Sequence, residues 1–321
     1  MKLELYFVIN EQAGGGHAKK IAAEIWQLCQ EKKLTYQSFT TEYPGHAIEL
    51  TLELLAKHLL PWSDDQTDQE QPFPLLVAIG GDGTLHEVVN ALGTEYLDIP
   101  IAYIPAGSGN DFARGHQLPR QAHLALEQLL NTAAPRSLNL LHYTERIGEE
   151  SGLFLNNIGI GLDAAVVAAT NRSSTKQQLN KYKLGSLTYM LAILKVLFQQ
   201  KGFPISIQAN GQEHSFPKAF LCTTMNQPYL GGGIKLSPHS SSAEANMDLL
   251  VVERISLLKI FYLIFQLARQ KHLASKYLHV FNSQEIRLIS LSSQYAQADG
   301  EELGQQPYEI TFTTSQRLFW F

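Results

Sequence analysis

The sequence has little cysteine and no long uncharged apolar run, and each absence excludes a class of protein. Its 321 residues include two cysteines, Cys29 and Cys222, far apart in the chain, which excludes a disulfide framework and a four-cysteine zinc site and fits a reducing compartment. The opening MKLELYFVIN carries charges at Lys2 and Glu4, unlike a signal peptide. Because no segment approaches the roughly 18 uncharged apolar residues of a membrane-spanning helix, we expect a cytoplasmic protein.

An excess of positive charge is also missing. With 25 Lys+Arg against 30 Asp+Glu, the net charge is −5 when His is neutral, whereas a general nucleic-acid binder carries a basic excess. Hydrophobic residues make up 45% and charged residues 17% of the chain, a globular composition. The length suggests about two domains of roughly 150 residues each.

Two segments lack acidic residues altogether. None occurs between Asp163 and Glu213, and none between Glu253 and Glu285. Their basic residues and apolar runs are Arg172, Lys176, Lys181, Lys183, Lys195, Lys201 and Leu187–Phe198 in the first, and Arg254, Lys259, Arg269, Lys271, Lys276 and Ile255–Ala268 in the second. A basic surface with exposed apolar groups suits an anionic membrane surface or a phosphorylated ligand. Two amphipathic core helices with basic outer faces are an equally good interpretation.

The first part of the chain, residues 1–138, alternates strand and helix patterns. The expected strands are Leu5–Ile9, Leu34–Thr40, Leu75–Ile79 and Ile99–Ile104, and the expected helices cover Ile21–Cys29, His46–Leu60 and a stretch from near Leu85, with a surface loop at 63–74. The all-apolar run Leu75–Ile79 is typical of a strand buried on both faces. We therefore predict a doubly wound, Rossmann-like parallel sheet.

From residue 139 to about 308 the pattern changes to short strand-like runs. These runs, such as PISIQA, KAFLCTT and DLLVVE, are rich in β-branched and aromatic residues and are bounded by turns. They predict an antiparallel β-sandwich, with helices inserted near Leu187–Phe198 and Leu257–Ala268.

The first loop with a chemical signal is Gly80-Gly81-Asp82-Gly83-Thr84, between a buried strand and a helix. Glycines let backbone N–H groups approach a ligand because no Cβ stands in the way, and the helix N-terminus favours anions. A tight turn in which Asp82 or Thr84 caps the helix is the alternative. Three glycines around one aspartate exceed what a cap needs, so we expect phosphate binding, although the loop is neither a Walker loop nor Gly-x-Gly-x-x-Gly.

The second loop is PAGSGNDFAR, Pro105 to Arg114, which also follows a predicted strand. It should open at the same edge of the sheet as the first loop, where ligands of such sheets bind. Alone, Asn110 and Asp111 would be explained as helix caps. Together, the two loops predict one nucleotide site.

Five motifs together resemble the diacylglycerol kinase catalytic family, whose bacterial soluble lipid kinases are nearer than its sphingosine kinases. The motifs are NEQAGGG from Asn10, TTEYPGHA from Thr40, GGDGTLHEVVNAL from Gly80, PAGSGNDFAR from Pro105 and ADGE from Ala298. GGDGT alone is shared with NAD kinases and loosely with phosphofructokinases, whereas its combination with GSGNDFAR is much more specific. The resemblance spans nearly the whole chain.

The resemblance implies an ATP- and Mg²⁺-dependent kinase that phosphorylates a lipid hydroxyl, with diacylglycerol converted to phosphatidic acid at the inner membrane surface. It implies a C-terminal return of 309–321 to the first domain, and a homodimer is common in such kinases. The implied ATP-binding residues are Asn10, Gly14, Thr41, Gly80, Gly81, Asp82, Gly83, Thr84, Glu87, Ser108, Asn110 and Asp111. Asp82 and Asp111 would position magnesium, with Asp82 also catalytic. Asp299 or Glu301 would be the base, although Asp-Gly alone favours a hairpin turn.

The chain departs from the family pattern at several positions. Glu11 and Gly16 stand where the family has proline and lysine, and Asn139 stands where an aspartate is expected. A magnesium site of the second domain would rest on Glu244-Ala245 rather than on Asp-Gly. Two alternatives stay open: an NAD kinase-like enzyme, which shares the GGDGT turn, and a nucleotide-binding sensor with weakened catalysis, which Asn139 and Glu244 favour. The acceptor can also be another lipid alcohol, such as a sphingoid base, phosphatidylglycerol or undecaprenol.

Overall fold

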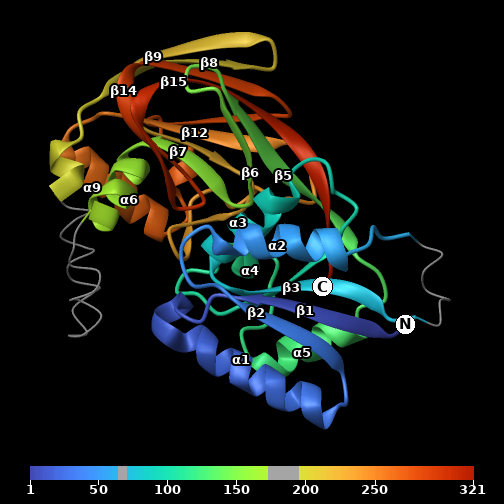
Figure 1. Ribbon diagram of the computed structural model, residues 1–321. Helices are drawn as coiled ribbons and strands as arrows, with labels where there is room; N and C mark the ends of the chain where they lie inside the picture. Colours follow the sequence, from blue (N-terminus) through green and yellow to red (C-terminus); the bar gives the residue numbers. More distant parts are fainter. Residues whose placement is uncertain (64–70, 173–194) are drawn as a thin grey trace. The chain divides into compact units, whose positions relative to one another are not determined.

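The computed structural model describes residues 1–63, 71–172 and 195–321, and it divides them into two compact units (Figure 1). Unit 1 comprises Met1–Leu140, Gly231–Gly233 and Ser315–Phe321, and unit 2 comprises Leu141–Leu230 and Ile234–Thr314. The boundaries predicted from the sequence were 138/139 and 308/309. Lys176, Lys181, Lys183 and most of the predicted helix Leu187–Phe198 lie outside the described residues, while 195–199 are helical.

Unit 1 is a parallel sheet covered by helices on both faces. The strands run in the order β2-β1-β3-β4, all parallel, and the end of a later strand joins β4 through the pair Phe319 and Ile101. Its elements are β1 (Leu3–Ile9), α1 (Ala13–Glu31), β2 (Thr35–Thr40), α2 (His46–Lys57), β3 (Phe73–Gly80), α3 (Asp82–Leu92), β4 (Ile101–Pro105), α4 (Asp111–Gly115) and α5 (Ala122–Asn131). Helices α1 and α5 pack on one face, and α2 packs beside α3 on the other (Figure 1). The predicted α/β class is confirmed.

The core of unit 1 explains why the sheet reaches further than the sequence predicted. Residues 75–79 are fully buried, as expected of a central strand. However, β3 already begins at Phe73, within the predicted loop 63–74, because the Phe73 ring packs against Trp62 and Trp320 at centroid distances of 5.3 and 6.2 Å. This aromatic packing outweighs the local preference of Pro74 for a loop.

The C-terminal residues complete unit 1. Trp320 is buried, and its indole Nε1–H donates to the Leu129 carbonyl at 2.9 Å. Arg317 is also buried and donates through Nη1 to the Tyr96 carbonyl at 3.0 Å. Burial lowers the pKa of this guanidinium to about 10. These contacts attach the last residues of the chain to the first domain.

Unit 2 is an antiparallel β-sandwich. Its strands follow the order β13-β12-β9-β7-β14-β15, with β8 beside β9 and β14, and with β5 beside β6 and β15. Its elements are β5 (Arg136–Glu145), β6 (Glu150–Phe154), β7 (Asn157–Gly161), α6 (Leu162–Arg172), β8 (Phe203–Ala209), β9 (Gln212–Met225), β10 (Tyr229–Leu230), β11 (Ile234–Lys235), β12 (Met247–Glu253), α9 (Leu257–Ala268), a 3-10 turn at His272–Ala274, β13 (Leu278–Ser283), β14 (Ile286–Ala298) and β15 (Glu301–Phe319). No helix among the described residues is both long enough and apolar enough to span a membrane.

Several other predicted boundaries were wrong. The helix expected over Ile21–Cys29 extends over Ala13–Glu31, and the helix expected over His46–Leu60 ends at Lys57. The helix expected from near Leu85 begins at Asp82, so the glycine motif itself forms the first helical turn. The strand expected from Ile99 begins at Ile101. Helix α9 begins at Leu257, as predicted.

Candidate active site

Three loops of unit 1 follow strands that end at one edge of the parallel sheet. Strands β1, β3 and β4 end at Ile9, Gly80 and Pro105. The loops after β3 and β4 are hydrogen-bonded to each other, because the Ala106 N–H donates to the Gly80 carbonyl at 2.7 Å. The structure therefore brings together the predicted motifs that begin at Asn10, Gly80 and Pro105.

The glycines of these loops touch one another through their backbones. A Cβ on Gly107 would lie 2.4 Å from the Cα of Gly81, and a Cβ on Gly14 would lie 2.5 Å from the Ala106 carbonyl oxygen. Gly14 also has a φ of 62°, in the left-handed region that favours glycine. Part of the glycine requirement is thus the packing of loop against loop, a role that the sequence did not reveal.

The rest of the first motif forms the start of α3. Gly81 is the N-cap residue, and Gly83 lies in the first turn. Thr84 is buried over Gly80, where an added Cβ would come within 2.4 Å of the threonine Oγ1. Gly80, Gly81 and Gly83 therefore place no side chain around the N-terminus of α3, and the close contact between Gly80 and Thr84 leaves no room for one at position 80.

The two predicted carboxylates of unit 1 lie side by side. The Asp82 carboxylate accepts the backbone N–H groups of Asp111 and Phe112 at 3.0 and 3.1 Å, so the first motif caps the helix that follows the second. Asp111 is 7% exposed; its Oδ1 accepts from Arg114 Nη1 at 2.5 Å and its Oδ2 from the Gly232 N–H at 2.7 Å. Both carboxylates are held in place by donors of the protein itself.

Asp82 and Asp111 fit a magnesium ion whose other ligands are water molecules and phosphate oxygens. No three His, Cys, Asp or Glu side chains of the described ranges come close enough together to form a metal site alone. Mg²⁺ is usually bound through one or two carboxylates, with waters and substrate phosphates completing the octahedron. Asp82 and Asp111 are the two carboxylates of unit 1 that would supply this protein share.

The predicted second-domain magnesium residue, Glu244, lies on an exposed turn. The buried carboxylate of that region is Asp248, which accepts hydroxyl donors from Ser237 and Ser240 at 2.7 Å each. This arrangement satisfies Asp248 within the protein and offers no cage around Glu244. We assign no metal to Glu244.

Asn110 shapes the second loop from inside. The residue is 2% exposed with a φ of 55°. Its Oδ1 accepts the Gly107 N–H at 3.0 Å, and its Nδ2 donates to the Gly107 carbonyl at 2.9 Å. Below it, the Tyr103 hydroxyl donates to the Gly80 carbonyl at 3.2 Å. Burial, and then the negative charge of Asp82, raise the pKa of Tyr103 well above its ordinary value, so this donor stays protonated.

Glu87 has a structural partner in the loop after β2. Its carboxylate accepts the N–H groups of Gly45 and Ala47 at 3.0 and 3.2 Å, which fixes the start of α2. Thr41 is attached to the end of β1 by its backbone N–H at 2.8 Å. Ser108, by contrast, is exposed at the tip of the second loop. Among these three predicted ATP-binding residues, Glu87 is hydrogen-bonded to the backbone of the loop after β2 and holds that loop in place.

Unit 2 contains the two candidate bases, and their surroundings differ. Asp299-Gly300 forms the two-residue hairpin between β14 and β15, with φ values of 49° and 91°. The Asp299 carboxylate accepts three backbone N–H groups, from residues 155, 156 and 157, at 2.8 to 3.1 Å. Glu301 is exposed on the first residue of β15. The expected hairpin and the expected carboxylates are both present.

Some residues of the unit 1 site were not singled out from the sequence. Arg114 ion-pairs with Asp111, and Arg120 lies 3.5 Å from the Gly107 carbonyl through Nη2. The spacing of Asp111 and Arg114, three residues apart on a helix, was a usable signal. Nothing local to Gly232 points to this site, because its loop is more than 100 residues away in sequence.

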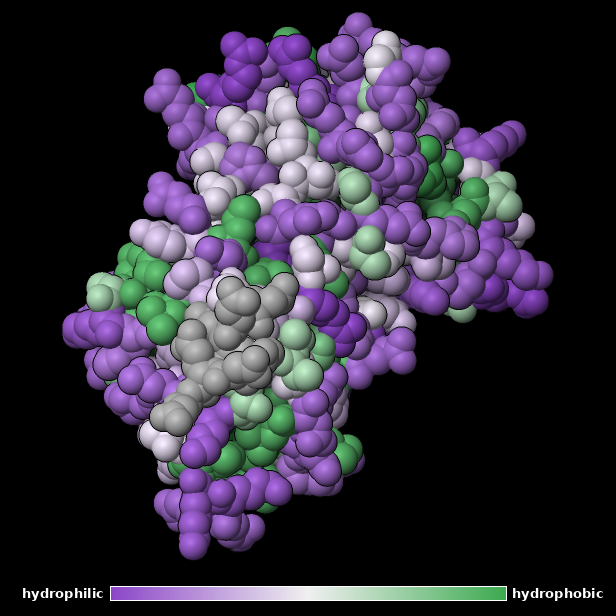
Figure 2. Space-filling model, turned by 90° about the vertical axis from the view of Figure 1, so that its right-hand side faces the viewer, coloured by the Kyte–Doolittle hydropathy of each residue, from purple (hydrophilic) through white to green (hydrophobic). Residues whose placement is uncertain are grey.

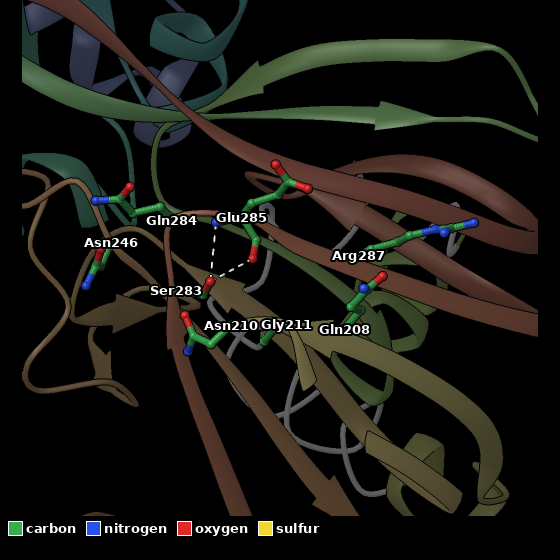
Figure 3. A pocket seen from close by; sticks show the side chains of 9 residues that line it. Gln208, Asn210, Gly211, Asn246, Ser283, Gln284, Glu285 and Arg287 are labelled. Carbon is green, nitrogen blue, oxygen red and sulfur yellow. Dashed lines mark hydrogen bonds between the residues drawn. The ribbon is translucent and has the colours of Figure 1, made fainter. Parts of the chain in front are cut away.

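A polar pocket of about 630 Å³ lies in unit 2, and none of the predicted site residues lines it (Figure 3). It is lined by two turns, that of the β8–β9 hairpin at Asn210-Gly211 and that of the β13–β14 connection at Ser283–Glu285. Ser283 Oγ is satisfied within the second turn, since it donates to the Glu285 carbonyl at 2.7 Å (Figure 3). We therefore interpret this pocket as the space between two hairpin turns.

A second cavity of unit 2 is apolar and measures about 190 Å³. It lies between α9 and the strands beneath it. Its one polar side chain, His272, is buried and donates through Nε2 to the Leu236 carbonyl at 2.7 Å. The lining residues are Leu162, Leu197, Phe220, Leu221, Leu230, Ile234, Leu236, Val252, Ile260, Leu263, Ile264, Leu267, His272 and Leu278.

Comparison with known families matches both parts of the chain. Residues 4–140 match the family described as "Diacylglycerol kinase catalytic domain", and residues 156–316 match the "YegS C-terminal NAD kinase beta sandwich-like domain". The first match contains the three loops of unit 1, and the second contains Asp299 and Glu301.

Individual proteins are similar over almost the full length. The chain is 30% identical over 315 residues to "Putative lipid kinase YtlR" of Bacillus subtilis (strain 168), covering 97% of each. It is 26% identical over 304 residues to "Diacylglycerol kinase" of the same organism, covering 94% of this chain and 91% of the relative. A crystal structure described as "a putative diacylglycerol kinase" from Bacillus anthracis str. Sterne has a TM-score of 0.74 at 21% identity, covering 99% of this chain and 95% of the other, which shows a common fold.

Proposed function

Because the chain belongs to the diacylglycerol kinase catalytic-domain family of lipid kinases, we propose that it transfers the γ-phosphoryl group of ATP to the hydroxyl of diacylglycerol, forming phosphatidic acid. The convergence of three glycine loops with two fixed carboxylates in unit 1 is the observation that carries this proposal. Phosphoryl transfer depends mainly on positioning and on neutralising charge, and this edge of the sheet offers both.

We assign the triphosphate of ATP to unit 1. The backbone N–H groups around Gly81 and Ser108 and the N-terminus of α3 provide donors for an anion without side-chain bulk. Asp82 and Asp111 would hold magnesium, which neutralises phosphate charge when bound. Because both carboxylates are already fixed by protein donors, they need little rearrangement for this task.

We assign the role of base to Glu301. Asp299 is engaged with three backbone N–H groups and therefore serves to position the hairpin, whereas Glu301 is exposed beside it. In the reaction, the lipid hydroxyl transfers its proton to the Glu301 carboxylate while its oxygen bonds to the γ-phosphorus. The bond from the γ-phosphorus to the bridging oxygen breaks, and ADP leaves with that oxygen.

The apolar cavity of unit 2 supports a lipid as the acceptor. Its lining is leucine, isoleucine, valine and phenylalanine except for His272, whose Nε2 is already hydrogen-bonded. An acyl chain gains free energy when its apolar surface leaves water for such a cavity. A soluble dinucleotide acceptor gains nothing comparable there.

The test is phosphoryl transfer by paired variants. Glu301→Gln should lower kcat at least 100-fold on diacylglycerol in mixed micelles, while Glu302→Gln, its neighbour in sequence, should keep wild-type activity. Asp82→Asn should lower the rate, whereas Glu95→Gln, exposed on unit 1, should not. Equal rates for Glu301→Gln and wild type would refute the role of Glu301. Transfer to NAD rather than to lipid, or tight ATP binding without turnover, would refute the proposed activity.

A further inference from the structure

Helix α9 of unit 2 is apolar on both its inner and its outer face. On the inner face, Ile260 is buried against Leu197 and Phe220, and Leu263 and Leu267 pack against the cluster around Leu250. These three helix residues follow the spacing of a single helix face and account for the attachment of α9 to the sheet.

The outer face presents large apolar side chains to solvent. Leu258, Phe261, Tyr262 and Phe265 are 83%, 42%, 59% and 56% exposed, and we call these four residues the docking face. Their spacing of three, four and seven residues places them on one stripe. Isolated exposed apolar residues are common, but a contiguous stripe on one helix marks an interaction surface.

The described residues outside α9 also include exposed apolar side chains. On the face shown in Figure 2, hydrophobic residues lie in several groups among hydrophilic ones. Leu291 of β14, which is 76% exposed, is a single exposed apolar side chain between Ser290 and Ser292. Leu291 therefore provides an isolated exposed apolar residue with which the docking face can be compared.

Basic residues lie on helix α9 and in the segment that follows it. The segment between Glu253 and Glu285 contains no acidic residue. Lys259 lies on the helix, and Arg269, Lys271 and Lys276 follow it; within the described residues none of the four has a carboxylate partner.

The cationic groups lie close to the rings of this surface. The Arg269 guanidinium stands 5.5 Å from the ring centre of Phe265. The ammonium groups of Lys259 and Lys276 stand 5.2 and 5.3 Å from the ring centre of Tyr277, and hydrogen bonding from Lys259 lowers the pKa of that tyrosine. Two lysine ammonium groups therefore lie near the same Tyr277 ring, and no carboxylate of the described residues pairs with either of them.

We propose that α9 lies in the interface of an anionic bilayer, with the docking face among the upper acyl chains and Lys259, Arg269, Lys271 and Lys276 against the lipid phosphates. An apolar stripe accompanied by cations that no carboxylate of the described residues neutralises matches the layering of such a bilayer, with hydrocarbon below and anionic headgroups beside it. A second copy of the chain fits this surface less well, because stacking one docking face on another brings like charges together.

The apolar cavity opens toward the same surface. Ile264 of α9 and Ile234 of β11 line the cavity and are also 46% and 49% exposed. A chain that leaves the bilayer at α9 therefore meets an apolar path into unit 2. This part of the inference rests on the proposed function, whereas bilayer binding by α9 does not.

The test is sedimentation with vesicles of phosphatidylcholine alone or of phosphatidylcholine with about one third phosphatidylglycerol, which supplies the anionic headgroups. Wild type should bind the anionic vesicles and release from them at high salt. Phe265→Asn and Leu258→Asn should each lower the affinity at least tenfold, and Leu291→Asn, the matched exposed control, should not. Lys271→Gln combined with Arg269→Gln should lower affinity for anionic vesicles and leave binding to neutral ones unchanged.

A second measurement does not depend on losing binding. The indole introduced by Tyr262→Trp, at a position 59% exposed, should be quenched by vesicles with brominated acyl chains. We expect this quenching with anionic vesicles and not with neutral ones. Absence of quenching, or equal vesicle binding by Phe265→Asn and wild type, would overturn the proposal. Conversion of a dimer to a monomer by Phe265→Asn, with vesicle binding intact, would show that a second copy covers α9 and would overturn it too.

Failure of the docking proposal can be told apart from failure of the proposed function. A diacylglycerol with chains short enough to be monomeric in water should be phosphorylated equally by wild type and by Phe265→Asn, since it needs no bilayer. If wild type does not phosphorylate this short-chain lipid, the proposed kinase activity is refuted. The vesicle experiments would still test the docking proposal by themselves.

Discussion

The contact between Gly81 and Gly107 allows the role of the glycine loops to be tested from both sides. In Gly107→Ala, the new Cβ would lie 2.4 Å from the Gly81 Cα and 2.8 Å from Asn110 Oδ1. Ordinary contacts of a Cβ begin near 3.4 Å, so the loops must separate by about 1 Å, and the obstructing Gly81 is backbone that has no rotamer to change. In Gly81→Ala, the Cβ would lie 3.3 Å from the Gly107 Cα, which a small shift relieves.

These distances predict unequal effects of two similar substitutions. Overpacking of this kind costs about 1–3 kcal/mol, so Gly107→Ala should lower the Tm of unit 1 by roughly 2–12 °C, and Gly81→Ala should lower it far less. The affinity for ATP should fall at least tenfold in Gly107→Ala because the loops that carry the N–H donors move apart. Scanning calorimetry and titration with ATP measure the two effects. Equal effects of the two variants, or a wild-type Tm for Gly107→Ala, would refute the reasoning that loop packing requires Gly107.

The remaining predictions concern one carboxylate of unit 2 and the pH dependence of each unit. Asp299→Asn should destabilise unit 2 by about 1–3 kcal/mol in urea, because one amide oxygen cannot replace a carboxylate that accepts three N–H groups; an unchanged midpoint would contradict this. Burial and the charge of Arg136 lower the pKa of His116 to about 4, so unfolded unit 1 binds an extra proton between about pH 4 and 6.5, and its stability should fall as the pH drops through that window. Burial raises the pKa of Asp163 to about 6, so folded unit 2 binds the extra proton and its stability should instead fall as the pH rises from about 4 to 6; urea unfolding from pH 4 to 7 should show these opposite slopes, which His116→Gln and Asp163→Asn should each flatten.

The elements of unit 1 were largely predictable because their signals are local. Apolar runs such as Leu75–Ile79 and the glycine motif at Gly80 report directly on buried strands and tight turns. The start of β3 was not predictable, since Phe73 joins the strand through contacts with Trp62 and with Trp320, 247 residues further along. A signal of that kind exists only once the chain has folded.

The candidate site shows the same division. The motifs identified Asp82 and Asp111, whereas the hydrogen bond from the Gly232 N–H to Asp111 comes from a distant loop. The sequence alone left Asp299 and Glu301 equivalent. The structure distinguishes the two carboxylates by their hydrogen bonds. Asp299 accepts three N–H groups from the segment 155–157, which lies 142 to 144 residues earlier in the chain.

The sequence of α9 allowed two interpretations. An apolar run with basic residues suits a core helix as well as a membrane-docking helix. The structure buries Ile260 and leaves Leu258 and Phe265 exposed, so the core interpretation explains only one side of the helix. Hydrophobic periodicity cannot reveal this when both faces are apolar.

The most direct measurement for the proposed reaction is the fate of the γ-phosphate. The wild-type protein is incubated with ATP labelled at that position, Mg²⁺, and diacylglycerol in mixed micelles, and the products are separated into organic and aqueous phases. We expect label in the organic phase as phosphatidic acid, in a one-to-one ratio with ADP. Label found only in inorganic phosphate or in a phosphorylated dinucleotide, with none in lipid, would contradict the account.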